Sequence, residues 1–194
     1  MLLENIINTS LLELIAGFGY LGGHFLLSKH KISGWIAKII GGSAWIVFLF
    51  QNNNLIFMTV TVVIVISMIY GLHKWKVGKF DKRTKVDNFF EILAALVAIF
   101  MITRFLLSGV YQLGPFVESI IVVAEILGTV LIARKKMAGW YAYIVMSILA
   151  GILVIFINPN PAILLGILEM ASIYFYIKGI KNFSKSTLAS PHRL

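Results

Sequence analysis

Seven apolar stretches, separated by short polar connections, constrain the fold of this chain more than any other feature. A helix needs about 20 mostly apolar residues to cross a lipid bilayer, within a range of about 17 to 25. The predicted transmembrane helices cover residues 11–27, 34–50, 55–72, 89–107, 115–133, 139–157 and 161–177. The sequence therefore predicts an all-α integral membrane protein with seven transmembrane helices.

The composition excludes several other classes of protein. Hydrophobic residues make up 59% of the chain and charged residues only 13%, whereas a soluble domain carries about 25% charged residues. A soluble globular domain and a disordered chain are both excluded. The chain has no cysteine, no His/Asp/Glu cluster with metal-ligand spacing and no phosphate-binding loop of the P-loop type, so we expect no metal, no cofactor and no ATPase activity.

The basic residues predict how the chain is oriented. Of the 17 Lys and Arg residues, all except Lys38 and Arg104 fall in connections on one side of the predicted bundle. Positive charge marks the cytoplasmic side, so the N-terminus is expected outside the cell and the C-terminus in the cytoplasm. We therefore expect a multi-pass protein of a bacterial plasma membrane, and no nucleic-acid partner for the basic surplus. Residues 1–10 lack the basic start of a signal peptide, so the first helix is expected to be retained.

An internal repeat is visible at an offset of about 105 residues. The segments Lys29-His30-Lys31-Ile32-Ser33-Gly34-Trp35 and Arg134-Lys135-Lys136-Met137-Ala138-Gly139-Trp140 each join two helices through a basic turn. We predict two three-helix repeats, in parallel orientation because one linker helix joins them, with the substrate path between them. The predicted parts are an outer N-terminus (1–10), a first repeat (11–76), a basic cytoplasmic loop (77–87), a linker helix (88–107), a second repeat (115–178) and a cytoplasmic tail (179–194).

Two aromatic motifs lie at helix ends. They are Tyr70-Gly71-Leu72-His73-Lys74-Trp75 and Trp140-Tyr141-Ala142-Tyr143. Both resemble motifs of the Pnu-type vitamin transporters, although Leu72 replaces a Trp and Ser147 stands where that family has Asn. The resemblance covers about residues 14–180. It implies a fold similar to that of the SWEET sugar transporters and facilitated diffusion of an uncharged, vitamin-like solute. Nicotinamide riboside, thiamine, riboflavin and deoxynucleosides are the candidates that it suggests.

The candidate substrate-binding residues are aromatic and polar. Trp140, Tyr143 and Ser147 are spaced i, i+3, i+7 and so share one helix face, which suits a flat ring and a ribose-like group. By the repeat, Trp35 lies on the equivalent face of the second helix, together with Lys38 and Gly42. Tyr70 is a further candidate from the family-like motif. The alternative is that Tyr143 packs against a neighbouring helix and that Trp140 lies at the membrane interface.

Glu125 and Glu169 are predicted to lie deep within helices, where charges are costly and usually functional. Three interpretations stay open: they line the substrate cavity, they couple transport to protons, or they are protonated acids hydrogen-bonded between helices. Lys38 is expected to extend towards the membrane surface. We expect no enzyme; a lipid-modifying enzyme using Glu125 or Glu169, and a receptor or scaffold of the same fold, are the alternatives. The candidate partners are a small-molecule substrate and further copies of the same chain in a homo-oligomer.

Overall fold

The chain is all-helical throughout the residues that the computed structural model describes, which are 11–78, 80, 83–107, 113–157 and 163–188. The helices are α2 (Leu11–Ser28), α3 (Ser33–Gln51), α4 (Leu55–Val77), α5 (Lys85–Leu107), α6 (Leu113–Ala133), α7 (Ala138–Ile152) and α8 (Ile163–Leu188), with a π-helical turn, η1 (Leu153–Ile157), following α7. The predicted all-α class is confirmed, and the described residues form seven α-helices, the number that the sequence predicts. The N-terminal segment 1–10, the turn at 158–161 and the last residues of the tail lie outside the described residues.

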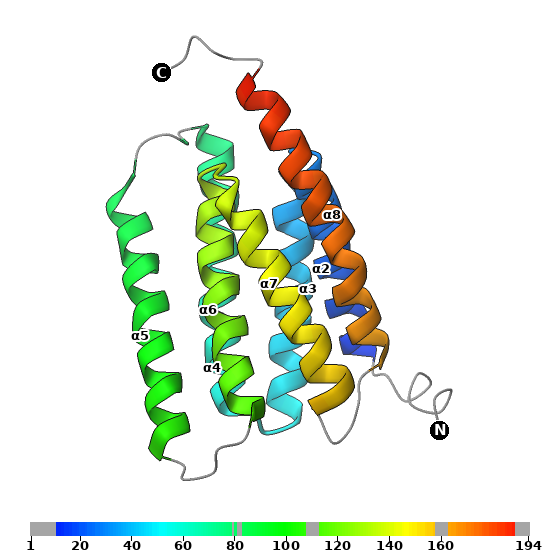
Figure 1. Ribbon diagram of the computed structural model, residues 1–194, viewed down its shortest axis with the longest axis vertical. Coiled ribbons are helices and arrows are strands. Elements are labelled where there is room, and N and C mark those ends of the chain that lie inside the picture. Colours follow the sequence, from blue (N-terminus) through cyan, green and yellow to red (C-terminus); the bar gives the residue numbers. More distant parts are fainter. Residues whose placement is uncertain (1–10, 79, 81–82, 108–112, 158–162, 189–194) are drawn as a thin grey trace.

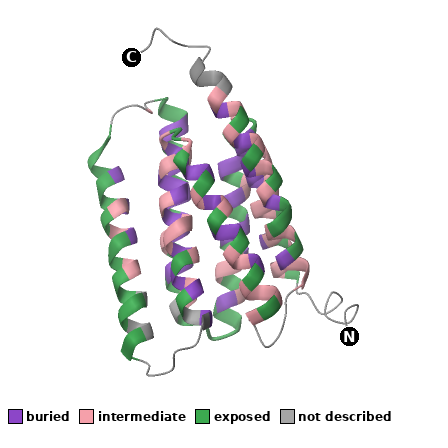
Figure 2. Ribbon diagram, in the orientation of Figure 1, coloured by how far each residue is buried: buried purple, intermediate pink, exposed green. Residues whose placement is uncertain are grey.

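Six helices, all except α5, are long and apolar enough in their described parts to cross a membrane. Their burial pattern differs from that of a soluble protein, because many large apolar side chains, such as Phe18, Phe156 and Tyr174, are exposed while His24 and Lys38 are fully buried. Green and pink residues accordingly cover much of the outside of the bundle (Figure 2). In water such a surface would be unstable, whereas a lipid environment accommodates it. The chain is therefore a multi-pass membrane protein.

The same six helices form a closed ring. Helix α2 packs against α3 and α8, α3 packs against α4, α4 against α6, α6 against α7, and α7 against α8. Helix α5 lies outside this ring and packs against α6, so it stands at one edge of the bundle (Figure 1). The ring thus contains two groups of three consecutive helices, α2–α4 and α6–α8, and the space between the groups is its interior.

Two turns at one end of the bundle have the same conformation. His30 (φ 57°) and Lys135 (φ 52°) both adopt the left-handed conformation. Each turn is closed by equivalent backbone hydrogen bonds, such as Lys31 N–H to Leu26 C=O and Lys136 N–H to Leu131 C=O. We call the end that carries these turns and the α4–α5 connection the basic end.

Some helix ends differ from the predicted bounds for local reasons. Helix α5 begins at Lys85, because Thr84 and Asp87 cap it reciprocally: Thr84 N–H donates to the Asp87 carboxylate, and Asp87 N–H donates to the Thr84 hydroxyl. Helix α4 extends to Val77 and ends at Gly78, whose φ of 73° suits glycine. Apolarity alone marks the membrane-embedded part of a helix and misses polar turns that continue it.

Helices α2 and α3 approach each other closely at Gly23. A Cβ atom at this position would collide with Lys38 Cγ and would lie 2.9 Å from the carbonyl oxygen of Gly34. We expect Gly23→Ala to lower the stability by about 1 to 2 kcal/mol, since extra atoms in a close-packed contact force backbone or side-chain shifts. Thermal unfolding of the purified protein in detergent measures this effect. Gly22→Ala is the matched control, because a Cβ at Gly22 meets nothing within 4 Å; equal stability losses in the two variants would contradict the prediction.

Candidate functional site

A buried ion pair connects the two three-helix groups inside the ring. Lys38 on α3 is fully buried, and its Nζ lies 3.6 Å from Glu125 Oε1 on α6. The same Nζ donates a hydrogen bond of 2.7 Å to the Tyr143 hydroxyl on α7 and lies 4.1 Å from the centre of that ring. Thr129 forms a further 2.7 Å hydrogen bond with the same hydroxyl. The expectation that Lys38 extends towards the membrane surface is wrong: an ion pair, a hydroxyl and an aromatic face compensate its ammonium in the interior.

A second set of polar groups continues this centre through α7, α8 and α2. Ser147 donates a 2.6 Å hydrogen bond to Glu169 Oε2 and lies 3.2 Å from the Tyr176 hydroxyl. That hydroxyl lies 2.9 Å from Nδ1 of His24. The His24 ring is 5.3 Å from the Tyr143 ring, so the two sets are contiguous. We call the residues of both sets the polar centre: His24, Lys38, Glu125, Thr129, Tyr143, Ser147, Glu169 and Tyr176.

Two tryptophans lie one helical turn nearer the basic end than Lys38 and Tyr143. Trp35 and Trp140 are both fully buried, and Gly71 and Gly179 leave room for their rings. Within the described part of the chain, neither buried indole N–H has a hydrogen-bond partner. Unpaired buried donors are costly, so these two N–H groups are exceptions among the buried polar groups of the described residues.

Six of the seven predicted site residues lie inside the ring. They are Trp35, Glu125, Trp140, Tyr143, Ser147 and Glu169. Sequence reasoning did not assign His24, Thr129 or Tyr176 to the site. For His24 and Thr129, the repeat could have provided a signal. These two residues are 105 positions apart, as are Lys38 and Tyr143, so the repeat makes them equivalent positions. For Tyr176, its position near the end of the predicted helix 161–177 gave no sign that its hydroxyl reaches His24 from the middle of α8.

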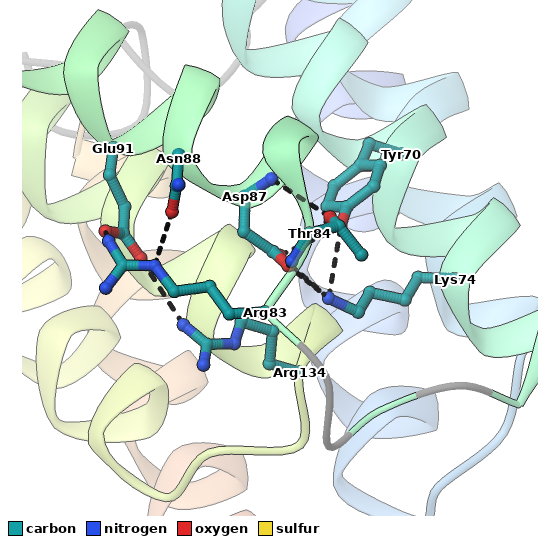
Figure 3. Close-up of polar contacts among 8 residues, drawn as sticks. All are labelled: Tyr70, Lys74, Arg83, Thr84, Asp87, Asn88, Glu91 and Arg134. Carbon is teal, nitrogen blue, oxygen red and sulfur yellow. Dashed lines mark hydrogen bonds and ion pairs between the residues drawn. The ribbon is translucent and has the colours of Figure 1, made fainter.

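Tyr70, the seventh, lies instead in a separate cluster at the basic end (Figure 3). Its hydroxyl donates a 2.8 Å hydrogen bond to Asp87 Oδ1, and Lys74 Nζ lies 2.7 Å from Asp87 Oδ2. Lys74 and Asp87 are both buried. Burial raises the pKa of the Asp87 carboxyl, but the hydrogen bonds from Lys74 and from its other donors outweigh this and hold the pKa below its usual range. Tyr70 therefore helps to fasten the first turn of α5 to α4.

The same cluster extends to the turn between α6 and α7. Glu91 on α5 forms ion pairs with Arg83 and with Arg134, the latter at 3.4 Å (Figure 3). Arg83 also bonds Asn88. Because Arg134 lies in the α6–α7 turn, these contacts fasten α5 to both three-helix groups at the basic end.

A ring of membrane helices that encloses polar and aromatic groups is typical of membrane transporters, in which the solute site lies between groups of helices. The model of the nicotinamide mononucleotide transporter family matches residues 10–181, and the chain belongs to this family. The resemblance to the Pnu-type transporters is confirmed, and so is the expectation that the chain belongs to a transporter rather than an enzyme family. No curated protein and no solved structure matches the chain at a significant level.

Proposed function

We propose that the protein carries a phosphate-free nicotinamide nucleoside, such as nicotinamide riboside, or a related vitamin or nucleoside across the membrane by facilitated diffusion. The polar centre is the observation that carries this proposal, since it offers hydroxyl and carboxylate groups for a ribose and aromatic faces for a flat ring. Lys38 is the one Lys or Arg that the described residues contribute to the polar centre, and it is paired with Glu125. A nucleotide phosphate would need unpaired basic groups, so we favour the nucleoside over the nucleotide.

The nicotinamide ring of such a nucleoside is a quaternary pyridinium and carries a positive charge. The proposed solute is therefore a cation, not the uncharged solute that the resemblance implied. This fits a centre with two carboxyl groups, on Glu125 and Glu169, and one amine, on Lys38.

We infer that α2–α4 and α6–α8 are parallel repeats related by an axis along the membrane normal. The equivalent turns at His30 and Lys135 support this, and so does the equivalence of the two contacts between groups, α2 with α8 and α6 with α4. Four positions of the interior follow the same offset of 105: Tyr20 and Glu125, His24 and Thr129, Lys38 and Tyr143, Gly42 and Ser147. In this proposal α5 is a seventh spanning helix that joins the repeats.

Alternating access follows from this arrangement by rocking of one group against the other around the polar centre. We propose a bacterial plasma membrane location with the basic end in the cytoplasm and the N-terminus outside, on the strength of the charge distribution. A fusion reporter after Leu194 that is active only in the cytoplasm tests this orientation.

Facilitated diffusion makes a direct prediction for purified protein in liposomes. Labelled nicotinamide riboside should enter until the internal and external concentrations are equal, with no membrane potential, because nothing in the proposal supplies energy. Protein-free liposomes are the control. Accumulation above the external concentration under a proton gradient, with the potential clamped, would instead establish proton coupling and give Glu125 or Glu169 that role. Absence of uptake for all nucleosides and B-vitamins would favour a receptor or scaffold.

A further inference from the structure

The ammonium group of Lys38 occupies the place inside the ring that best suits a cation. It lies 4.1 Å from the centre of the Tyr143 ring, 5.6 Å from that of Tyr20 and 3.6 Å from Glu125 Oε1. Two aromatic faces and a carboxylate are the groups that recognise an organic cation. Here the protein's own side chain holds the place that such a ligand would take.

The ion pair between Lys38 and Glu125 has a consequence for transport. A carrier that works by facilitated diffusion must return across the membrane empty after it releases its solute. A carboxylate at Glu125 without a counter-ion would make the closed, empty state costly, because a buried charge that has lost its partner is strongly destabilising. Lys38 supplies that partner when no solute is bound.

We propose that Lys38 is a built-in counter-ion: its ammonium neutralises Glu125 in the empty carrier. In the loaded carrier it gives up this place to the positively charged ring of the solute and pairs with Glu169, the second carboxyl group of the polar centre. The inference rests on the proposed function, because it concerns the return step of a facilitator. It assigns to Lys38 a role in the empty carrier's reorientation and in the preference for a cationic ring.

The packing around Lys38 permits such an exchange. The lysine carries its charge on a flexible chain of methylenes, and these lie against the backbone of α2, where Gly23 leaves room for them. The Tyr143 hydroxyl also forms a hydrogen bond with Thr129, and this contact does not involve the lysine. The ring that would stack on the solute is thus held by an independent partner.

Two transport assays on the same proteoliposomes separate the return step from the loaded step. Net uptake of labelled nicotinamide riboside into empty liposomes needs the empty carrier to return. Counterflow, in which unlabelled nicotinamide riboside is present inside, needs only the loaded carrier. For Lys38→Met we expect net uptake to fall by about tenfold or more, since Glu125 has no counter-ion in the empty carrier, while counterflow is retained. The double variant Lys38→Met/Glu125→Gln, which has no charge to neutralise, should regain net uptake.

Lys29→Met is the matched control. Lys29 also has its ammonium over an aromatic ring, 4.1 Å from the centre of Phe25, but it is exposed at the basic end. Net uptake and counterflow by this variant should both match those of the unaltered protein. A Lys38→Met protein that is folded and loses or keeps both activities together would overturn the proposal. If Lys38→Met does not fold, the double variant Lys38→Met/Glu125→Gln tests the proposal instead. Counterflow without net uptake in the double variant would reject a counter-ion role for Lys38. An unaltered protein without either activity would instead reject the proposed function, and this inference with it.

Discussion

Asp87→Asn is expected to destabilise the protein by about 3 to 5 kcal/mol, because it leaves the buried ammonium of Lys74 without its counter-ion. Lys74 Nζ contacts both carboxylate oxygens of Asp87, at 2.8 and 2.7 Å. The substitution also weakens the reciprocal cap between Asp87 and Thr84 that begins α5. Unfolding of the purified protein by increasing SDS in mixed micelles measures the loss.

The same cluster provides the control. Arg83 is an ion-pair partner with 56% of its side chain exposed, so Arg83→Gln should cost no more than about 1 kcal/mol. Removing both charges with Lys74→Met/Asp87→Leu should recover much of the lost stability, because no buried charge is then unpaired. If Asp87→Asn and Arg83→Gln cost the same, the buried pair does not hold α5 as described.

The pH dependence of this effect has a definite sign. The pKa of Asp87 is lowered in the folded protein, so the stability that its carboxylate contributes is complete above the unfolded-state pKa of about 3.9 and is lost as the pH falls through the folded-state value. The stability difference between the unaltered protein and Asp87→Asn should therefore be constant near neutral pH and shrink below about pH 4.

The helices could be predicted from the sequence because the membrane acts on each of them separately. Each must be apolar over about 20 residues and must satisfy its own backbone hydrogen bonds, so a single stretch contains the whole signal. The start of α5 shows the limit of this signal. Thr84 and Asp87 begin that helix in a polar segment, and the apolar pattern starts only later, near Phe89.

The site was predictable only as far as helix periodicity reaches. The spacing of Trp140, Tyr143 and Ser147 placed all three on one face, and all three are fully buried. Which distant residue each would meet was not contained in that spacing. Lys38 points inward because Glu125 lies on a helix of the other group, and Tyr70 leaves the interior because Asp87 lies at the start of α5. Such partners depend on how the helices pack in space. The offset of 105 residues relates Lys38 to Tyr143, but it does not relate Lys38 to Glu125 or Tyr70 to Asp87.

Tyr143→Ala is expected to weaken the binding of nicotinamide riboside by about 1 to 3 kcal/mol, the scale of one ring stacked on an aromatic side chain. This corresponds to about tenfold or more in affinity. The Tyr143 ring is fully buried, and its hydroxyl joins Lys38 and Thr129 in the polar centre. Calorimetric titration of the purified, folded variant measures the affinity. Tyr143→Phe keeps the ring and removes the hydroxyl, so it should cost only about 0.5 to 1.5 kcal/mol.

Tyr141→Ala is the matched control on the same helix. Tyr141 is 54% exposed and turned about 200° away from Tyr143, since each residue of a helix turns about 100°. Its removal should leave the affinity unchanged. Weaker binding in Tyr141→Ala together with unaltered binding in Tyr143→Ala would place the solute on the outer side of α7. The polar centre would then be a structural network, because a solute that does not contact Tyr143 does not share the contacts that hold Lys38 and Glu125 together.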